Sequence, residues 1–92
     1  METEVITIEK TAGPGTAGYA HVILFNDDYH TFDDVICQLI LAINCSYKVG
    51  EKMAMTVHTE GKCKVFEGAM EECLHVSAVL EAIDLKTEIG FE

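Results

Sequence analysis

The sequence predicts a single α+β domain in which three helices lie on one face of a three-stranded antiparallel sheet, in the order β-α-α-β-α-β. Its 92 residues suffice for one modest hydrophobic core but not for two. Short runs of β-branched and aromatic residues alternate with longer segments whose apolar residues recur at helical spacing. With so few elements, the economical packing places the helices together on one side of a small sheet.

Residues 1–18 are predicted to be a flexible N-terminal extension or linker, and residues 19–92 the folded domain. Gly and Pro dominate Thr11–Gly18, and no apolar residue is periodic there. Ahead of it, Val5–Ile8 fits either a short edge strand or a mobile segment, and the pattern does not decide between them.

The first strand is expected over Tyr19–Asn26, because Val22–Phe25 is β-branched or bulky and apolar on both faces, as in a buried strand. A helix should begin near Thr31. Thr31-Phe32-Asp33-Asp34 fits a threonine N-cap with an acid at the third helical position. Apolar residues then recur at helical spacing, and Asn44 is a reasonable stop.

A second helix is expected from a cap at Ser46 to about Thr59, just before the helix-ending glycine Gly61. Gly50 costs this helix about 1 kcal/mol relative to alanine, so its first turn should be weak. The remaining elements are a strand, a helix and a strand over Lys62–Phe66, Ala69–Ala82 and Lys86–Phe91.

The charge and the cysteines exclude several classes of function. Only 6 Lys and Arg stand against 16 Asp and Glu, and the net charge of −10 argues against nucleic acid and favours basic or amino-terminal partners. The longest apolar stretch, Val35–Ile43, is too short to cross a membrane, and the opening residues show no secretory signal. A cytoplasmic protein with four reduced thiols is expected. The cysteine spacings do not predict zinc, so no metal and no cofactor are expected.

Two polar motifs stand at element ends that a small fold can bring together. Asn26-Asp27-Asp28 closes the first strand, and His58 stands near the end of the second helix. Their side chains can accept hydrogen bonds, and a peptide's α-ammonium group offers three donors. Each motif also has a simpler reading. Asn and Asp often only turn the chain, and a histidine at a helix C-terminus can serve only the helix dipole.

The segments carrying these motifs resemble the ClpS family, small adaptors that hand N-degron substrates to the Clp protease. The family's strand-end signature, roughly V-I-L-x-N-D-D-x-T-P-M-E-F-V, corresponds to Val22–Val35. Its helix-end signature, A-V-H-x-x-G-K or a close variant, corresponds to Thr56–Lys62. Both occur in the family's order, and the resemblance covers about Tyr19–Glu92.

The resemblance implies that Asn26, Asp27 and His58 hold the α-amino group of a substrate, and that no residue is catalytic. A neighbouring cavity would take the first side chain, whose burial stabilises the complex by about 2–3 kcal/mol. The positions matching that hydrophobic pocket are Asp28, His30, Phe32, Val35, Ala54 and Val57.

The chain departs from the family within this pocket. His30-Thr31-Phe32 replaces the family's Thr-Pro-Met, and Ala54 stands where a methionine is frequent. A bulkier ring at the mouth and a smaller wall inside predict altered selectivity, with an aromatic residue or leucine still preferred first. The family's last pocket residue falls somewhere in Leu85–Ile89.

A second departure concerns the partner. The resemblance implies docking on the N-domain of a ClpA- or ClpC-like ATPase through an acid and a lysine near the third helix. Ala69 and Leu74 occupy those two positions here. From the resemblance as a whole, the leading hypothesis is a non-enzymatic N-degron adaptor that delivers substrates to a Clp ATPase–protease. The alternative is a ClpS-like peptide-binding or regulatory protein that has lost or changed chaperone docking.

Two hypotheses from other classes rank lower. A hydrolase could use Asp27, Asp28 and His58 for acid–base chemistry, but no nucleophile accompanies them at a recognisable spacing. A metal site drawing on His58 and Cys63 is weaker still.

Overall fold

A computed structural model of the protein describes residues 19–91. It contains three helices and three strands in the predicted order, so the α+β class is confirmed. The expected extension 1–18, including Val5–Ile8, lies outside the described residues. The elements are β1 (Tyr19–Phe25), α1 (Phe32–Ile43), α2 (Tyr47–Glu60), β2 (Lys62–Ala69), α3 (Met70–Glu81) and β3 (Thr87–Phe91).

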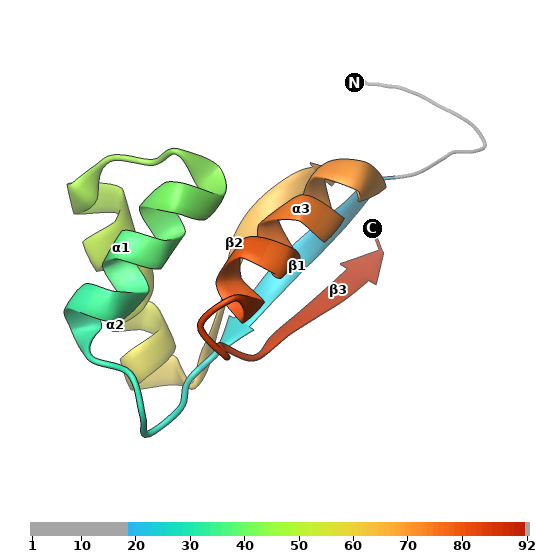
Figure 1. The fold of residues 1–92 in the computed structure, drawn as a ribbon. Coiled ribbons are helices and arrows are strands. Elements are labelled where there is room, and N and C mark those ends of the chain that lie inside the picture. The colour runs from blue at the N-terminus through green and yellow to red at the C-terminus, as the bar shows by residue number, and fades with distance from the viewer. Residues whose placement is uncertain (1–18, 92) are drawn as a thin grey trace.

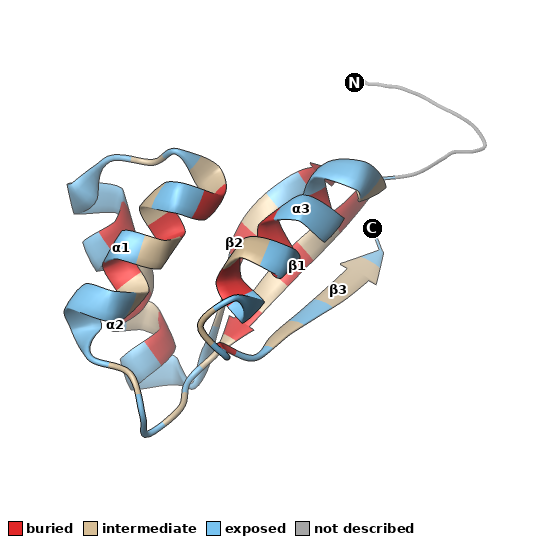
Figure 2. Ribbon diagram, in the orientation of Figure 1, coloured by how far each residue is buried: buried red, intermediate tan, exposed pale blue. Residues whose placement is uncertain are grey.

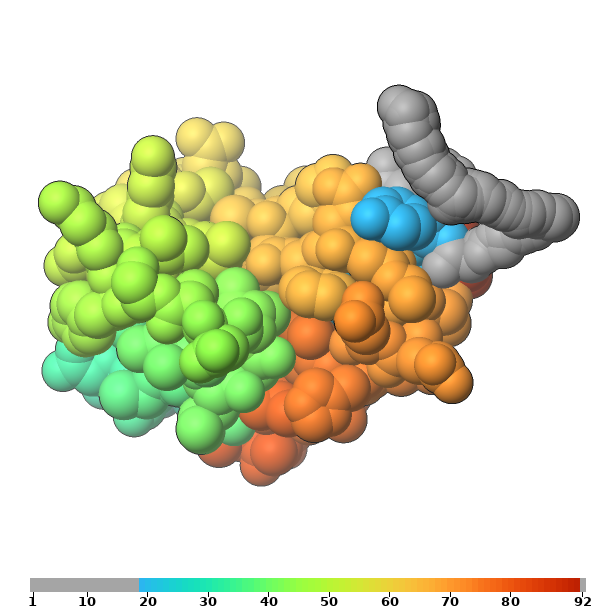
Figure 3. Space-filling view, turned by 90° about the horizontal axis from the view of Figure 1, so that it is seen from above, coloured from blue at the N-terminus to red at the C-terminus, as the bar shows by residue number. Residues whose placement is uncertain are grey.

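The sheet has β1 in its centre, in the order β2-β1-β3, with both neighbours antiparallel to it. Helix α3 lies along one face and packs against all three strands (Figure 1). Helices α1 and α2 form a pair beside it, where α1 contacts α3 and α2 contacts β2. Viewed from above, this helix pair and the α3–β2 half lie side by side (Figure 3).

The core lies between α3 and the sheet and continues between the helices. Ala20, Val22 and Leu24 of β1 are fully buried, and Leu39 of α1 and Leu80 of α3 belong to the same cluster of buried residues. Figure 2 shows the buried positions in red. The intervening residues of β1 are only half-buried. The expectation of a strand buried on both faces was therefore wrong, because no described helix covers the second face of the sheet.

The helix ends follow their sequence signals. The Thr31 hydroxyl accepts a hydrogen bond from the N–H of Asp34, whose carboxylate accepts one in return from the N–H of Thr31. Asn44 ends α1 in the left-handed region at φ 56°. Ser46 caps α2 through the N–H of Val49.

Gly50 is used for close packing. It is buried, and a Cβ atom there would lie 3.3 Å from Cγ2 of Ile36 on α1. Glycine lowers the helix propensity at this position, as predicted, but its lack of a side chain lets α1 and α2 approach closely.

Strand β2 is longer than predicted, and it runs to Ala69 because it pairs with β1 along its whole length, from Phe25–Lys62 to Tyr19–Ala69. An irregularity between Val22 and Ile23 adjusts the register. Helix α3 then begins directly, without a side-chain cap from Ala69. Among residues 19–91, no helix has the length and apolar character needed to span a membrane.

Candidate functional site

One backbone hydrogen bond joins the two polar motifs. The N–H of Asn26, just past β1, donates to the carbonyl of Gly61 at 3.0 Å. Gly61 ends α2 with φ +91°, and its own N–H donates to the carbonyl of Val57. The end of the first strand is thereby tied to the last turn of α2, where His58 stands.

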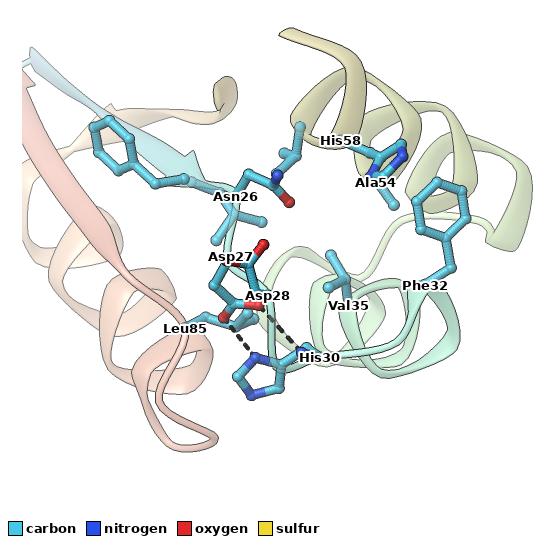
Figure 4. Close-up of a pocket in the computed structure, with 12 residues that line it drawn as sticks. Asn26, Asp27, Asp28, His30, Phe32, Val35, Ala54, His58 and Leu85 are labelled. Carbon is cyan, nitrogen blue, oxygen red and sulfur yellow. Dashed lines mark hydrogen bonds and ion pairs between the residues drawn. The ribbon is translucent and has the colours of Figure 1, made fainter. Parts of the chain in front are cut away.

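A pocket of about 290 Å³ opens at this junction (Figure 4). All nine residues predicted for the site line it: Asn26, Asp27, Asp28, His30, Phe32, Val35, Ala54, Val57 and His58. The structure brings them together in one place. Their individual binding roles stay predictions.

Three acceptor side chains of this pocket have no hydrogen-bonding or ion-pair partner among residues 19–91. Asn26, Asp28 and His58 are exposed, and their side chains make no hydrogen bond or ion pair to any residue in 19–91. The amide oxygen of Asn26 faces the open centre of the pocket, across from His58 (Figure 4). These groups are available to a ligand that carries several N–H donors.

Asp27 is already engaged. Its Oδ1 accepts hydrogen bonds from the backbone N–H groups of Tyr29 and His30, both at 3.1 Å, and its Oδ2 lies 2.6 Å from Nδ1 of His30. Burial alone would raise the pKa of this carboxyl. The hydrogen bonds from Tyr29 and His30 outweigh burial, so the pKa of Asp27 is lowered and the carboxylate is ionised at neutral pH.

His30 connects two segments of the chain. Besides the contact with Asp27, its Nε2 lies 2.5 Å from the carbonyl oxygen of Ile83, in the turn between α3 and β3. The hydrogen bond with Asp27 raises the pKa of His30, while burial opposes this and the contact with the Ile83 carbonyl supports it.

The apolar side of the pocket comes mainly from the helices. Ala54 and Val57 of α2 and Leu85, before β3, are almost completely buried and form its floor. Phe32 is 36% exposed at the start of α1, and its ring meets the His58 ring edge-on, with centroids 5.4 Å apart. This contact fixes one side of the pocket mouth.

Two lining residues, Leu24 and Phe25, were missed by sequence reasoning, and a third, Leu85, lies within the range Leu85–Ile89 in which the last pocket residue was expected. Ile83 and Leu85 are the apolar residues of the turn into β3, and that turn lies beside the end of β1, where the N–H of Phe25 donates to the carbonyl of Lys86. The apolar character of the turn was therefore the usable signal.

A metal centre finds no support in the described part of the chain. Within residues 19–91, no three His, Cys, Asp or Glu side chains are grouped so that they could hold a metal ion. Burial also raises the pKa of the Cys63 thiol, which disfavours the thiolate form that binds metals.

Comparison with known proteins gives the family. A profile of the ClpS family, described as ATP-dependent Clp protease adaptor protein ClpS, matches residues 17–90. The chain belongs to the ClpS family. The resemblance read from the two motifs is thereby confirmed.

The chain is also similar to part of two curated proteins and, in its fold, to a solved structure. The chain is 35% identical over 60 residues to the E3 ubiquitin-protein ligase UBR2 of Homo sapiens and equally to that of Mus musculus. The match covers 65% of this chain and 3% of each ligase, so the chain corresponds to a small part of those proteins. The fold matches the structure of Agrobacterium tumefaciens ClpS2 bound to L-phenylalaninamide, with a TM-score of 0.71, 21% identity, and coverage of 82% of this chain and 98% of that one.

Proposed function

We propose that this protein is a non-enzymatic adaptor that binds the free N-terminal residue of other polypeptides when that residue has a large hydrophobic side chain. The carrying observation is that unpartnered acceptors and a buried apolar floor line the same pocket. An α-ammonium group supplies the donors, and the side chain on the same carbon fills the apolar part. A volume of about 290 Å³ suits one side chain rather than a longer segment.

The ligand of the similar structure has the chemistry that this pocket requires. L-Phenylalaninamide, which ClpS2 of Agrobacterium tumefaciens binds in that structure, carries a free α-amino group next to an aromatic side chain. In our proposal Asn26, Asp27 and His58 contact the amino group of the substrate. Its first side chain lies against the pocket residues Asp28, His30, Phe32, Val35, Ala54 and Val57, together with Leu85.

Delivery to the N-domain of a ClpA- or ClpC-like ATPase, in the cytoplasm, is the second part of the proposal. A specific observation favours an alternative in which docking is lost or changed. Ala69 and Leu74 are both exposed, Leu74 at 56%, at the positions where the resemblance implies an acid and a lysine. The similarity to UBR2 points the same way, because there a segment of this kind belongs to a much longer ubiquitin ligase.

Calorimetric titration with peptides identical except at the first residue tests the binding step. Peptides starting with Phe or Leu should bind with micromolar affinity, about 8 kcal/mol, and those starting with Ala or Arg more weakly. An acetylated Phe peptide should not bind, because acetylation removes the cation and two of its donors. Equal binding of free and acetylated peptides would refute the proposal.

Two variants test the acceptors. Asn26→Ala and His58→Ala should each weaken binding of the Phe peptide by about tenfold or more, since each removes a hydrogen bond to a charged group. Asp33→Asn, an exposed change on the first turn of α1, is the matched control and should bind as the wild type does. Unfolding curves show whether each variant remains folded.

A pull-down on an immobilised Clp ATPase N-domain separates the two delivery hypotheses. The double variant Ala69→Glu/Leu74→Lys restores the acid and the lysine of the family pattern. Capture of the variant but not of the wild type supports lost docking, and equal capture of both supports docking through other contacts.

A further inference from the structure

We propose that His30 is a positioning residue of this pocket: as an imidazolium it donates hydrogen bonds from both ring nitrogens, holding Asp27 on one side and the turn that carries Leu85 on the other. The consequence for peptide binding rests on the proposed function. The charge state of the His30 ring does not depend on the proposed function, because it follows from contacts within the protein.

The two partners of the ring are both acceptors. Nδ1 lies 2.6 Å from Oδ2 of Asp27, a carboxylate whose other oxygen already accepts two backbone N–H groups. Nε2 lies against the carbonyl oxygen of Ile83, which cannot donate. A neutral imidazole has one N–H and could donate to only one of these two acceptors. At the other acceptor, the lone pair of the ring nitrogen would face a lone pair of the oxygen. The His30 side chain is only 14% exposed, so water does not readily relieve that repulsion.

The charges around the ring favour the same state. Asp27 precedes it in the loop, and Asp34 on the first turn of α1 adds a second negative charge. The α3–β3 turn contributes the Ile83 carbonyl dipole, and only burial opposes protonation. The pKa of His30 is therefore above its ordinary 6.5 and that of Asp27 below its ordinary 3.8, so the bridge between them persists throughout the interval that separates the two pKa values.

The bridge determines what Asp27 offers to a ligand. Oδ1 is saturated by two N–H groups, and Oδ2 has one lone pair left after the bond from His30. Its negative charge is balanced by the imidazolium. Asp28, which has no described partner, is then the uncompensated carboxylate of the pocket.

The bridge also determines where the apolar floor lies. Ile83 is in the turn that leads to Leu85, and Leu85 is 3% exposed at the base of the pocket. Without the donor at Nε2, the hydrogen bond between this turn and the loop that carries Asp27 is lost. His30 therefore helps to fix the distance between the polar and apolar halves of the pocket, together with the backbone hydrogen bond from Phe25 to Lys86.

Ring nitrogen NMR on the wild type tests the charge state without any ligand. The chain has four histidines, and the His30 signals are those missing from His30→Gln. At pH 6.5, the ordinary pKa of a histidine side chain, both ring nitrogens of His30 should be protonated in most molecules, because its pKa is raised. A His30 ring that is mostly neutral at pH 6.5 would overturn the inference, whether or not the protein binds peptides.

A matched pair of variants tests the positioning role. In His30→Asn the amide nitrogen stands near the place of Nδ1, and in His30→Gln near that of Nε2, so each keeps one donor and neither is charged. Each should bind the Phe peptide about tenfold more weakly than the wild type at pH 6.5, because a charge-assisted bond is lost. The ratio of wild-type to variant affinity should fall as the pH rises through the titration of His30. The ionisation of the peptide amine affects both affinities equally and cancels in this ratio.

The outcomes separate this inference from the proposed function. His75→Gln, a change of an exposed histidine on α3, is the control and should leave binding unchanged. Equal affinity of wild type and both His30 variants at every pH would refute the positioning role while leaving N-terminal recognition intact. If the wild type binds no peptide, the proposed function fails and the ring titration alone decides the inference.

Discussion

Ala54 sets the size of the apolar end of the pocket. It is 2% exposed on α2, lines the pocket floor, and stands where the family pattern often has methionine. Ala54→Met would place a flexible thioether in the space available to the first side chain. Peptides that start with Trp or Phe should then bind about tenfold more weakly, and those that start with Leu should lose less. Fluorescence anisotropy across a first-residue panel measures this.

Glu51→Met is the control for Ala54→Met, because it adds the same side chain at an exposed position one turn earlier on α2. It should leave the order of preference unchanged. A uniform loss for every first residue in Ala54→Met would show that overpacking has disturbed the fold rather than the selectivity.

The two aspartates of the strand-end motif show the limit of prediction at the residue scale. In the sequence Asp27 and Asp28 are neighbours of the same type, and both were candidates for the site. The structure commits Asp27 to Tyr29 and His30 and leaves Asp28 without a described partner. That difference arises from the course of the turn and from the contact of His30 with the carbonyl of Ile83, 53 residues further along the chain. No local sequence pattern encodes this contact.

Gly61 ends helix α2, and the site depends on it because its carbonyl holds the backbone of Asn26. Its φ of +91° is a conformation that L side chains rarely adopt, although the space around it is open. Gly61→Ala should lower the free energy of unfolding by about 1 kcal/mol. For a domain of this size that lowers the melting temperature by roughly 4–8 °C. Thermal unfolding followed by circular dichroism measures the change.

Gly61→Asn separates backbone strain from other effects of adding a side chain. Asparagine tolerates the left-handed region, so this variant should recover part of the loss seen for alanine. Equal destabilisation by both residues would contradict the strain argument. Peptide binding should weaken with stability, because the Gly61 carbonyl holds the backbone of Asn26.

The helix ends were predictable because their signals are local. Thr31, Asn44, Ser46 and Gly61 each act within a few residues of themselves, and each stands where the sequence placed it. Strand β2 was predicted too short because its length is set by its pairing with β1. The apolar residues of β1 likewise indicated burial on both faces, whereas burial depends on whether another element covers each face.

In the whole molecule, the pocket lies at the junction between the sheet and the α1–α2 pair. The end of β1, the last turn of α2 and the turn into β3 meet there, so no single element contains the site. The two motifs could be placed together from the sequence through the family resemblance. The contribution of the turn into β3 could not, because it depends on how α3 returns the chain across the sheet.

The net charge of −10 should act on the approach of a substrate as well as on its bound state. A peptide that starts with Phe-Lys should associate about two- to tenfold faster at 0.01 M salt than at 0.1 M salt. The reason is that the screening length is about 30 Å at 0.01 M but only about 10 Å at 0.1 M. A Phe-Glu peptide should show a much smaller dependence or the opposite one. Stopped-flow fluorescence gives both rates, and Asp28→Asn should reduce the dependence because it removes the uncompensated charge at the pocket. Equal salt dependence for the two peptides would mean that encounter is not steered by the acidic surface.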